Sequence, residues 1–143
     1  MFCQTMDSNS VNMQNEVSLD WSAYYQSLDS TFSLNNFSLE QTDTLNFCEG
    51  NVFGSFDIEF DDIYKSFIVF SPNQEKYIDF DSYHWQLDKN QLAIFSPDQE
   101  INLVNLKEQT VLRIAFNGPL RWVEDAFWKN DTSIVLLENS TEG

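Results

Sequence analysis

The feature that most restricts the fold is a series of short apolar segments, separated by turn residues, between residues 52 and 138. In "VFGSFDIEFDDIY" every second side chain from Phe56 to Phe60 is apolar, and the side chains between them are acidic. Successive side chains of a strand point to opposite faces, so this pattern predicts a half-buried antiparallel strand. Further strands are predicted at 66–70, 76–87, 92–95, 101–106, 110–116, 121–128 and 133–138.

These segments predict a single all-β domain over residues 18–138, built mostly of antiparallel sheet. A sandwich, an open barrel and blade-like stacked hairpins all fit the pattern. The run 66–70 is continuously apolar, which predicts a more central strand. Residues 1–17 and 139–143 are polar and lack periodicity, so both are predicted to be tails.

The part of the domain before residue 52 carries weaker signals. Residues 18–29 place apolar side chains at i, i+3, i+4 and i+7 from Trp21, which predicts one short helix, with a strand as the alternative. Ser18 or Asp20 would cap this helix, and no capping box is expected. Residues 30–50 alternate apolar and polar side chains, which predicts short strands with turns at 35–36 and 49–50.

A hexapeptide occurs twice, as "FSPNQE" at 70–75 and "FSPDQE" at 95–100. Proline presets the first corner of a turn, and asparagine or aspartate tolerates the second. The repeat therefore predicts two hairpins with similar turns, and the following Gln-Glu pair has no explanation at this level.

Residues 65–138 contain "FSPN", "YIDF", "EINLVNLKEQTVLRIAF" and "VEDAFWKNDTSIVLL", in this order. This order resembles strands of β-propeller blades whose turns read S-P-D-G, and it also resembles an uncharacterised family of bacterial secreted or lipid-anchored proteins. Glycine is absent after Pro-Asn and Pro-Asp, and the chain has room for at most about two blades, whereas a closed propeller takes about four or more. The resemblance implies blade-like hairpins and no activity.

Charge is distributed unevenly along the chain. There are 23 acidic and 7 basic residues, for a net charge of −16, and residues 1–64 hold 11 acids and no Lys or Arg. Such a surface repels nucleic acid and anionic membrane, because few cations are present to neutralise phosphates. A basic partner, a cation or simple solubility are the explanations left, and solubility is the favoured one. The candidate interaction patch is acidic throughout and consists of Glu40, Asp43, Glu49, Asp57, Glu59, Asp61 and Asp62.

No constellation of residues indicates catalysis or a resident cofactor. Asp57, Glu59 and Asp61 would line one face of a strand as a ladder that suits a hard cation, but a solvated acidic face is the favoured interpretation. His84 is the single histidine and would need Ser82 or Cys48 beside it to form a nucleophilic pair. His84 is therefore interpreted as structural, and the protein as non-enzymatic.

The N-terminus suggests a location. No apolar run is long enough to span a membrane, but "MFC" followed by a polar segment resembles the region around a lipoprotein cleavage site. Cys3 would then carry a lipid anchor if a signal lies upstream. The sequence thus favours a non-enzymatic, extracytoplasmic, envelope-associated binding protein. The alternative is an acidic inhibitor or immunity-type protein that binds a basic enzyme or mimics nucleic acid.

Overall fold

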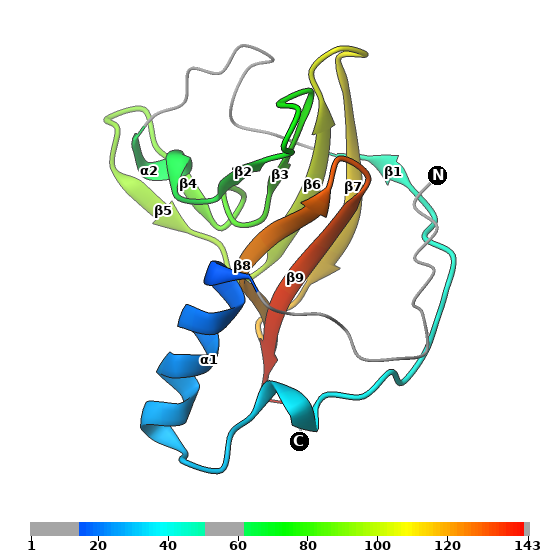
Figure 1. Ribbon diagram of the computed structural model, residues 1–143. Coiled ribbons are helices and arrows are strands. Elements are labelled where there is room, and N and C mark those ends of the chain that lie inside the picture. Colours follow the sequence, from blue (N-terminus) through cyan, green and yellow to red (C-terminus); the bar gives the residue numbers. More distant parts are fainter. Residues whose placement is uncertain (1–14, 51–61, 142–143) are drawn as a thin grey trace. The chain divides into compact units, whose positions relative to one another are not determined.

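The computed structural model describes residues 15–50 and 62–141 (Figure 1). The chain divides into two compact units, Met1–Leu45 and Asn46–Gly143, which we describe separately. This division falls inside residues 18–138, and the predicted single domain over that range stays a prediction. The expected strand over 52–64 lies mostly outside the described residues, and its end forms a one-turn helix, α2 (Asp62–Lys65), instead.

The first unit contains the predicted helix, α1 (Glu16–Leu28). Its N-cap is Asn15, whose side chain accepts a hydrogen bond from the Val17 N–H at 2.9 Å. The Ser18 hydroxyl oxygen in turn accepts a hydrogen bond from the backbone N–H of Asn15 at 3.2 Å, which completes a capping box. The predicted cap at Ser18 or Asp20 was therefore wrong. An amide in place of Ser or Thr at the first position, and a hydroxyl in place of Glu or Gln at the fourth, hid the motif.

Aromatic rings hold the helix to the segment that follows it. The Trp21 ring lies 5.0 Å from Tyr25 and 5.6 Å from Phe32, and Phe32 lies 6.0 Å from Phe37. The strands expected in this segment are absent from residues 30–47, which contain a 3-10 helix, η1 (Leu34–Asn36), and irregular chain. Phe32 and Phe37 pack on the aromatic rings of α1, Leu39 and Leu45 are exposed, and no described strand lies alongside to complete the strand pattern.

The second unit is built on an open five-stranded antiparallel sheet, in the order β1-β7-β6-β3-β2. Its strands are β1 (Cys48–Glu49), β2 (Ile68–Phe70), β3 (Lys76–Asp79), β6 (Gln99–Asn105) and β7 (Thr110–Asn117). Two antiparallel pairs complete the unit: β4 (Trp85–Leu87) with β5 (Ala93–Phe95), and β8 (Arg121–Asn130) with β9 (Ser133–Ser140). The predicted all-β class, mostly antiparallel with a short N-terminal helix, is confirmed.

The centre of the sheet is β6, where every residue from Gln99 to Val104 is buried. The expectation of a central strand at 66–70 was wrong, because β2 lies at the edge of the sheet. The long β8–β9 hairpin is joined to β2 by the Trp128 indole N–H, which donates to the Val69 carbonyl at 2.9 Å. The apolar run is therefore half-buried at the edge of the sheet, where it contacts β8.

The two copies of the repeated hexapeptide have different structures. In the first copy, Gln74 N–H donates to the Ser71 carbonyl at 2.8 Å, and Gln74 takes a left-handed φ of 58° at the corner of the β2–β3 hairpin. In the second copy, Gln99 is the first residue of β6, and the turn joins β5 of one sheet to β6 of another. The prediction of two similar hairpins was right for the first copy only.

Candidate functional site

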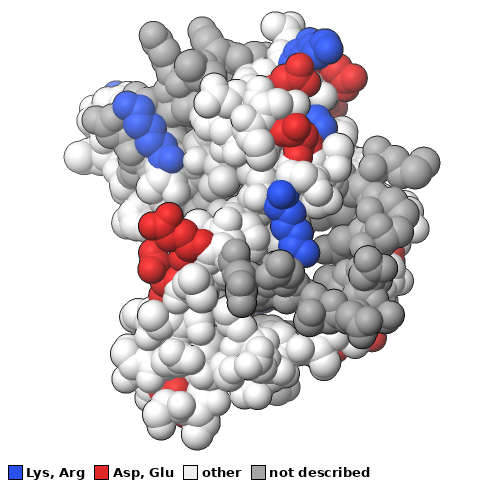
Figure 2. Space-filling view, in the orientation of Figure 1, with Lys and Arg blue, Asp and Glu red and all other residues white. Residues whose placement is uncertain are grey.

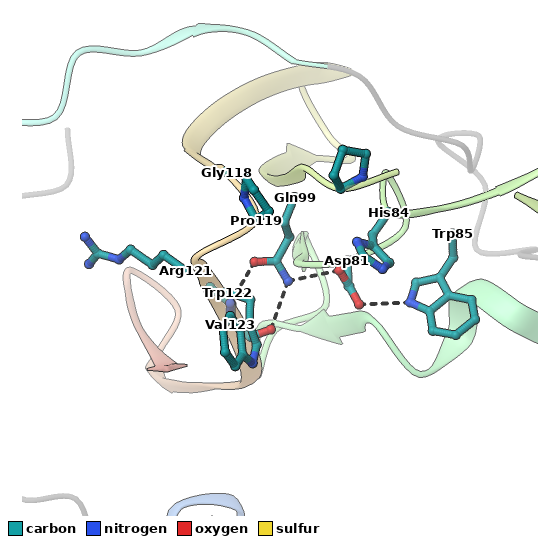
Figure 3. A pocket seen from close by; sticks show the side chains of 10 residues that line it. Asp81, His84, Trp85, Gln99, Gly118, Pro119, Arg121, Trp122 and Val123 are labelled. Carbon is teal, nitrogen blue, oxygen red and sulfur yellow. Dashed lines mark hydrogen bonds between the residues drawn. The ribbon is translucent and has the colours of Figure 1, made fainter. Parts of the chain in front are cut away.

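A hollow of about 210 Å³ forms where the second hexapeptide copy meets the connection between β7 and β8 (Figure 3). It is lined by Asp81, His84, Trp85, Pro97, Gln99, Gly118, Pro119, Arg121, Trp122 and Val123. The lining combines indole and proline surfaces with a carboxylate, an imidazole and a guanidinium. Pockets for small molecules usually measure about 300–1,000 Å³, so this hollow is small for such a ligand.

The Gln99 side chain is the polar centre of the hollow. It is 4% exposed, and its Oε1 accepts a hydrogen bond from the Val123 N–H at 2.7 Å. Its Nε2 donates to the Val123 carbonyl and to Asp81 Oδ1, each at 2.9 Å, as Figure 3 shows. The side-chain amide thus gives Val123 both bonds that a neighbouring strand would supply. Gln99 thereby joins the start of β6 to β8.

Asp81 is held by the same network. Its Oδ1 accepts from Gln99, and its Oδ2 accepts from the Trp85 indole N–H at 3.0 Å. Burial raises the pKa of Asp81, while the bonds from Gln99 and Trp85 and the charge of His84 act in the opposite direction. Both carboxylate oxygens are therefore engaged by the protein itself.

His84 is placed by aromatic neighbours. Its ring lies 5.8 Å from Trp85 and 6.2 Å from Phe95, and its carbonyl accepts the Ser96 N–H at 2.9 Å. The two nucleophiles considered from sequence are not among the residues that line the hollow. Ser82 donates its hydroxyl to Asp79, and Cys48 is exposed in the edge strand β1. The structural interpretation of His84 stays a prediction.

Arg121 supplies the cation of the hollow, but it is turned outward. Figure 3 shows its side chain pointing away from Asp81 and Gln99. Its guanidinium contacts the Glu138 carboxylate at 2.5 Å, and 60% of the side chain is exposed. An ion pair this exposed contributes little to stability, and Glu138 already offsets much of the charge that a ligand would meet.

A second buried carboxylate, Asp79, lies in β3 and is 1% exposed. The Ser82 N–H donates to its Oδ1 at 2.9 Å, and the Ser82 hydroxyl donates to its other oxygen. Burial is the main cause that raises the pKa of Asp79 to about 6, since the bonds from Ser82 only partly offset it. This residue does not line the hollow.

The structure describes only part of the predicted acidic patch. Glu40 and Asp43 are exposed in the first unit, and Glu49 is exposed in β1 of the second unit. Cys3, Asp57, Glu59 and Asp61 lie outside the described residues, and Asp62 begins α2. Within the described residues, no three His, Cys, Asp or Glu side chains gather as a metal site would require.

Sequence reasoning missed Gln99 and Asp81 as the centre of the hollow. The only signal was the Gln-Glu pair after the second turn, which turn chemistry did not explain. Trp85 and Trp122 are both half-buried beside the hollow.

No family model, no curated protein and no solved structure matches this chain. Across the residues that the structure describes, helices are too short or too polar to cross a membrane.

Proposed function

We propose that this protein is a non-enzymatic binding protein whose ligand is a basic protein. The observation that carries the proposal is the excess of 23 acidic over 7 basic residues. Among the acidic residues that the structure describes, Asp79 and Glu100 are the two that are buried. Apart from Asp62, the remaining carboxylates of the described residues are at least partly in contact with solvent, where their field acts on an approaching partner.

The hollow supports the non-enzymatic part of this proposal, because its central polar side chains are hydrogen-bonded within the protein. Asp81 and Gln99 bond to each other and to Trp85 and Val123. A small polar ligand would have to replace these bonds, and a general base would have to be free to take a proton. The arrangement therefore favours a structural joint between β6 and β8 over a reaction centre.

In Figure 2 the acidic side chains that are drawn in red stand in small groups, some of them beside basic side chains in blue. A net charge of this size nonetheless steers a basic partner toward the protein over about one Debye length, roughly 8–10 Å at physiological salt. We therefore expect fast, salt-sensitive association. An acidic inhibitor of a basic enzyme is the form of this function that the charge favours.

The test is capture from a lysate by the immobilised full chain at low and at high salt, followed by identification of the captured proteins. We expect basic proteins at low salt and their release at high salt. Capture that is indifferent to salt, or no capture at either salt, would contradict the proposal.

A pair of matched variants tests the charge more sharply. One replaces the exposed carboxylates of Glu40, Asp43 and Glu49 by amides, and the other replaces Asp81 by asparagine. We expect the first to slow association with the captured partner, and the second to leave it unchanged. The reverse result would make the hollow the binding site. An extracytoplasmic setting with a lipid on Cys3 stays a prediction, since Cys3 lies outside the described residues.

A further inference from the structure

The outer edge of β5 is open for pairing. In the β4–β5 pair, Asp88 N–H donates to the Leu92 carbonyl at 2.8 Å, and Ser96 N–H donates to the His84 carbonyl at 2.9 Å. Bonded and non-bonded pairs alternate along an antiparallel ladder, so Ile94 faces Gln86 while Ala93 and Phe95 turn their backbone groups outward. Among the residues that the structure describes, none bonds to those outward groups.

The side chains on this edge are apolar and exposed. Leu92 is 64%, Ile94 55% and Phe95 59% exposed. Edge strands usually carry a charge, a proline or a bulge that prevents pairing with another chain, and Ala93–Phe95 carries none of them. Exposed apolar residues on an unprotected strand indicate a surface that is covered in a complex.

Other edges of the described sheets differ from β5. Strand β1 is two residues long, and all three residues of β2 are half-buried at the opposite edge of the five-stranded sheet. All three residues of β5 are exposed, and Figure 1 shows β5 at the outer side of its hairpin, away from β6 and β7. Strand β5 is therefore more exposed than the short or half-buried strands at the two edges of the five-stranded sheet.

We infer that β5 binds an extended, basic segment of a protein partner by strand addition. This inference rests on the proposed function and names the binding mode and the place. The occupant follows from charge complementarity, because a second copy of this chain would also carry a net charge of −16. Asp98 follows β5 by three residues and is half-buried, so its charge favours a lysine at that end of an added segment, whereas the Asp88 carboxylate already accepts the N–H groups of Asn90 and Leu92.

In this complex the backbone groups of Ala93 and Phe95 bond to the added strand. Side chains of a strand alternate, so Leu92 and Ile94 contact the apolar residues of the partner on one face, and the basic residues of the partner lie on the other face, beside Phe95. The partner segment would therefore alternate apolar with basic residues, or carry basic residues at both ends of a short apolar run.

The test uses a synthetic peptide that alternates valine and lysine, with a valine–glutamate peptide as the control. Binding and amide hydrogen exchange are measured on the full chain at low salt. We expect the basic peptide alone to bind and to slow exchange at Ala93 and Phe95. The Ile94 amide, which faces β4, should change little.

Two substitutions at one position complete the test. Ala93→Pro removes the outward N–H, so we expect it to bind the peptide roughly tenfold more weakly. Ala93→Val keeps this N–H, so we expect its affinity for the peptide to be unchanged. Slow exchange of the Ser96 amide, which bonds to His84 within the hairpin, reports that the hairpin is intact. Should Ala93→Pro disrupt the hairpin, slower exchange at Ala93 and Phe95 of the unmodified chain in the presence of the peptide still tests whether the peptide binds at this edge.

The outcomes separate this inference from the proposed function. Binding of the basic peptide without protection at Ala93 and Phe95 overturns the edge assignment and leaves the proposed function standing. Failure of the basic peptide to bind, together with failure to capture any basic protein, overturns both. Protection of these two amides that rises with protein concentration in the absence of peptide shows that a second copy occupies the edge, and overturns the basic occupant.

Discussion

Replacing Asp79 by asparagine should change how the stability of this protein depends on pH. Asp79 is 1% exposed, and burial raises its pKa from 3.8 to about 6. A carboxyl group with a raised pKa in the folded state favours folding while it is protonated. Its contribution is therefore complete below about pH 4 and is lost as the pH rises through about 6.

The difference between these two pKa values corresponds to about 3 kcal/mol of folding free energy. Asparagine has the same shape, does not titrate, and keeps an oxygen that can accept the Ser82 N–H, now 2.9 Å from Asp79 Oδ1. We therefore expect the free energy of unfolding of Asp79→Asn, measured relative to that of the unmodified protein, to rise by about 3 kcal/mol as the pH increases from 4 to 7.

The assay is denaturant unfolding of both proteins across this pH range. The difference between them cancels the titration of the other carboxylates. Ser82→Ala serves as a second probe, because it removes one of the bonds that lower the pKa of Asp79 and should extend the loss of stability to higher pH. A constant difference between Asp79→Asn and the unmodified protein, or a difference of opposite slope, would refute the reasoning.

Five further substitutions, two of them controls, test the Gln99 joint, the packing at Gly50 and the turn at Gln74. Gln99→Leu should lower the free energy of unfolding by about 2–4 kcal/mol in denaturant titrations, because it removes both hydrogen bonds to the buried backbone of Val123. Its control, Gln74→Leu in the other hexapeptide copy, should change this free energy by no more than about 0.5 kcal/mol. Gly50→Ala should cost about 1–3 kcal/mol, since its Cβ would lie 2.0 Å from Asn102 Oδ1, and Gly118→Ala, with no atom within 4 Å, should be neutral in thermal unfolding. Gln74→Gly should raise the melting temperature, because glycine relieves about 1 kcal/mol of left-handed strain at φ 58°.

The sequence predicted those features that depend on neighbouring residues. The short apolar segments 101–106, 110–116 and 133–138 are separated by turn residues, and all three are strands as predicted. The helix near Trp21 also follows from local spacing, although its cap does not, because Asn15 and Ser18 form a variant of the usual box. Local patterns failed at 30–47, where apolar residues pack on α1 and no strand lies alongside.

Sequence alone determined the all-β class and the acidic balance, because both depend on residue type and local periodicity. Tertiary structure decided which strands pair, which strand lies at the centre and which edge stays open. The hexapeptide shows the reason most directly. Its two copies share five of six residues, yet Gln74 turns a corner in solvent and Gln99 joins β6 to Val123 of β8, 24 residues further along the chain. A side chain's role is set by the groups that long-range contacts place around it, and no local pattern encodes those groups.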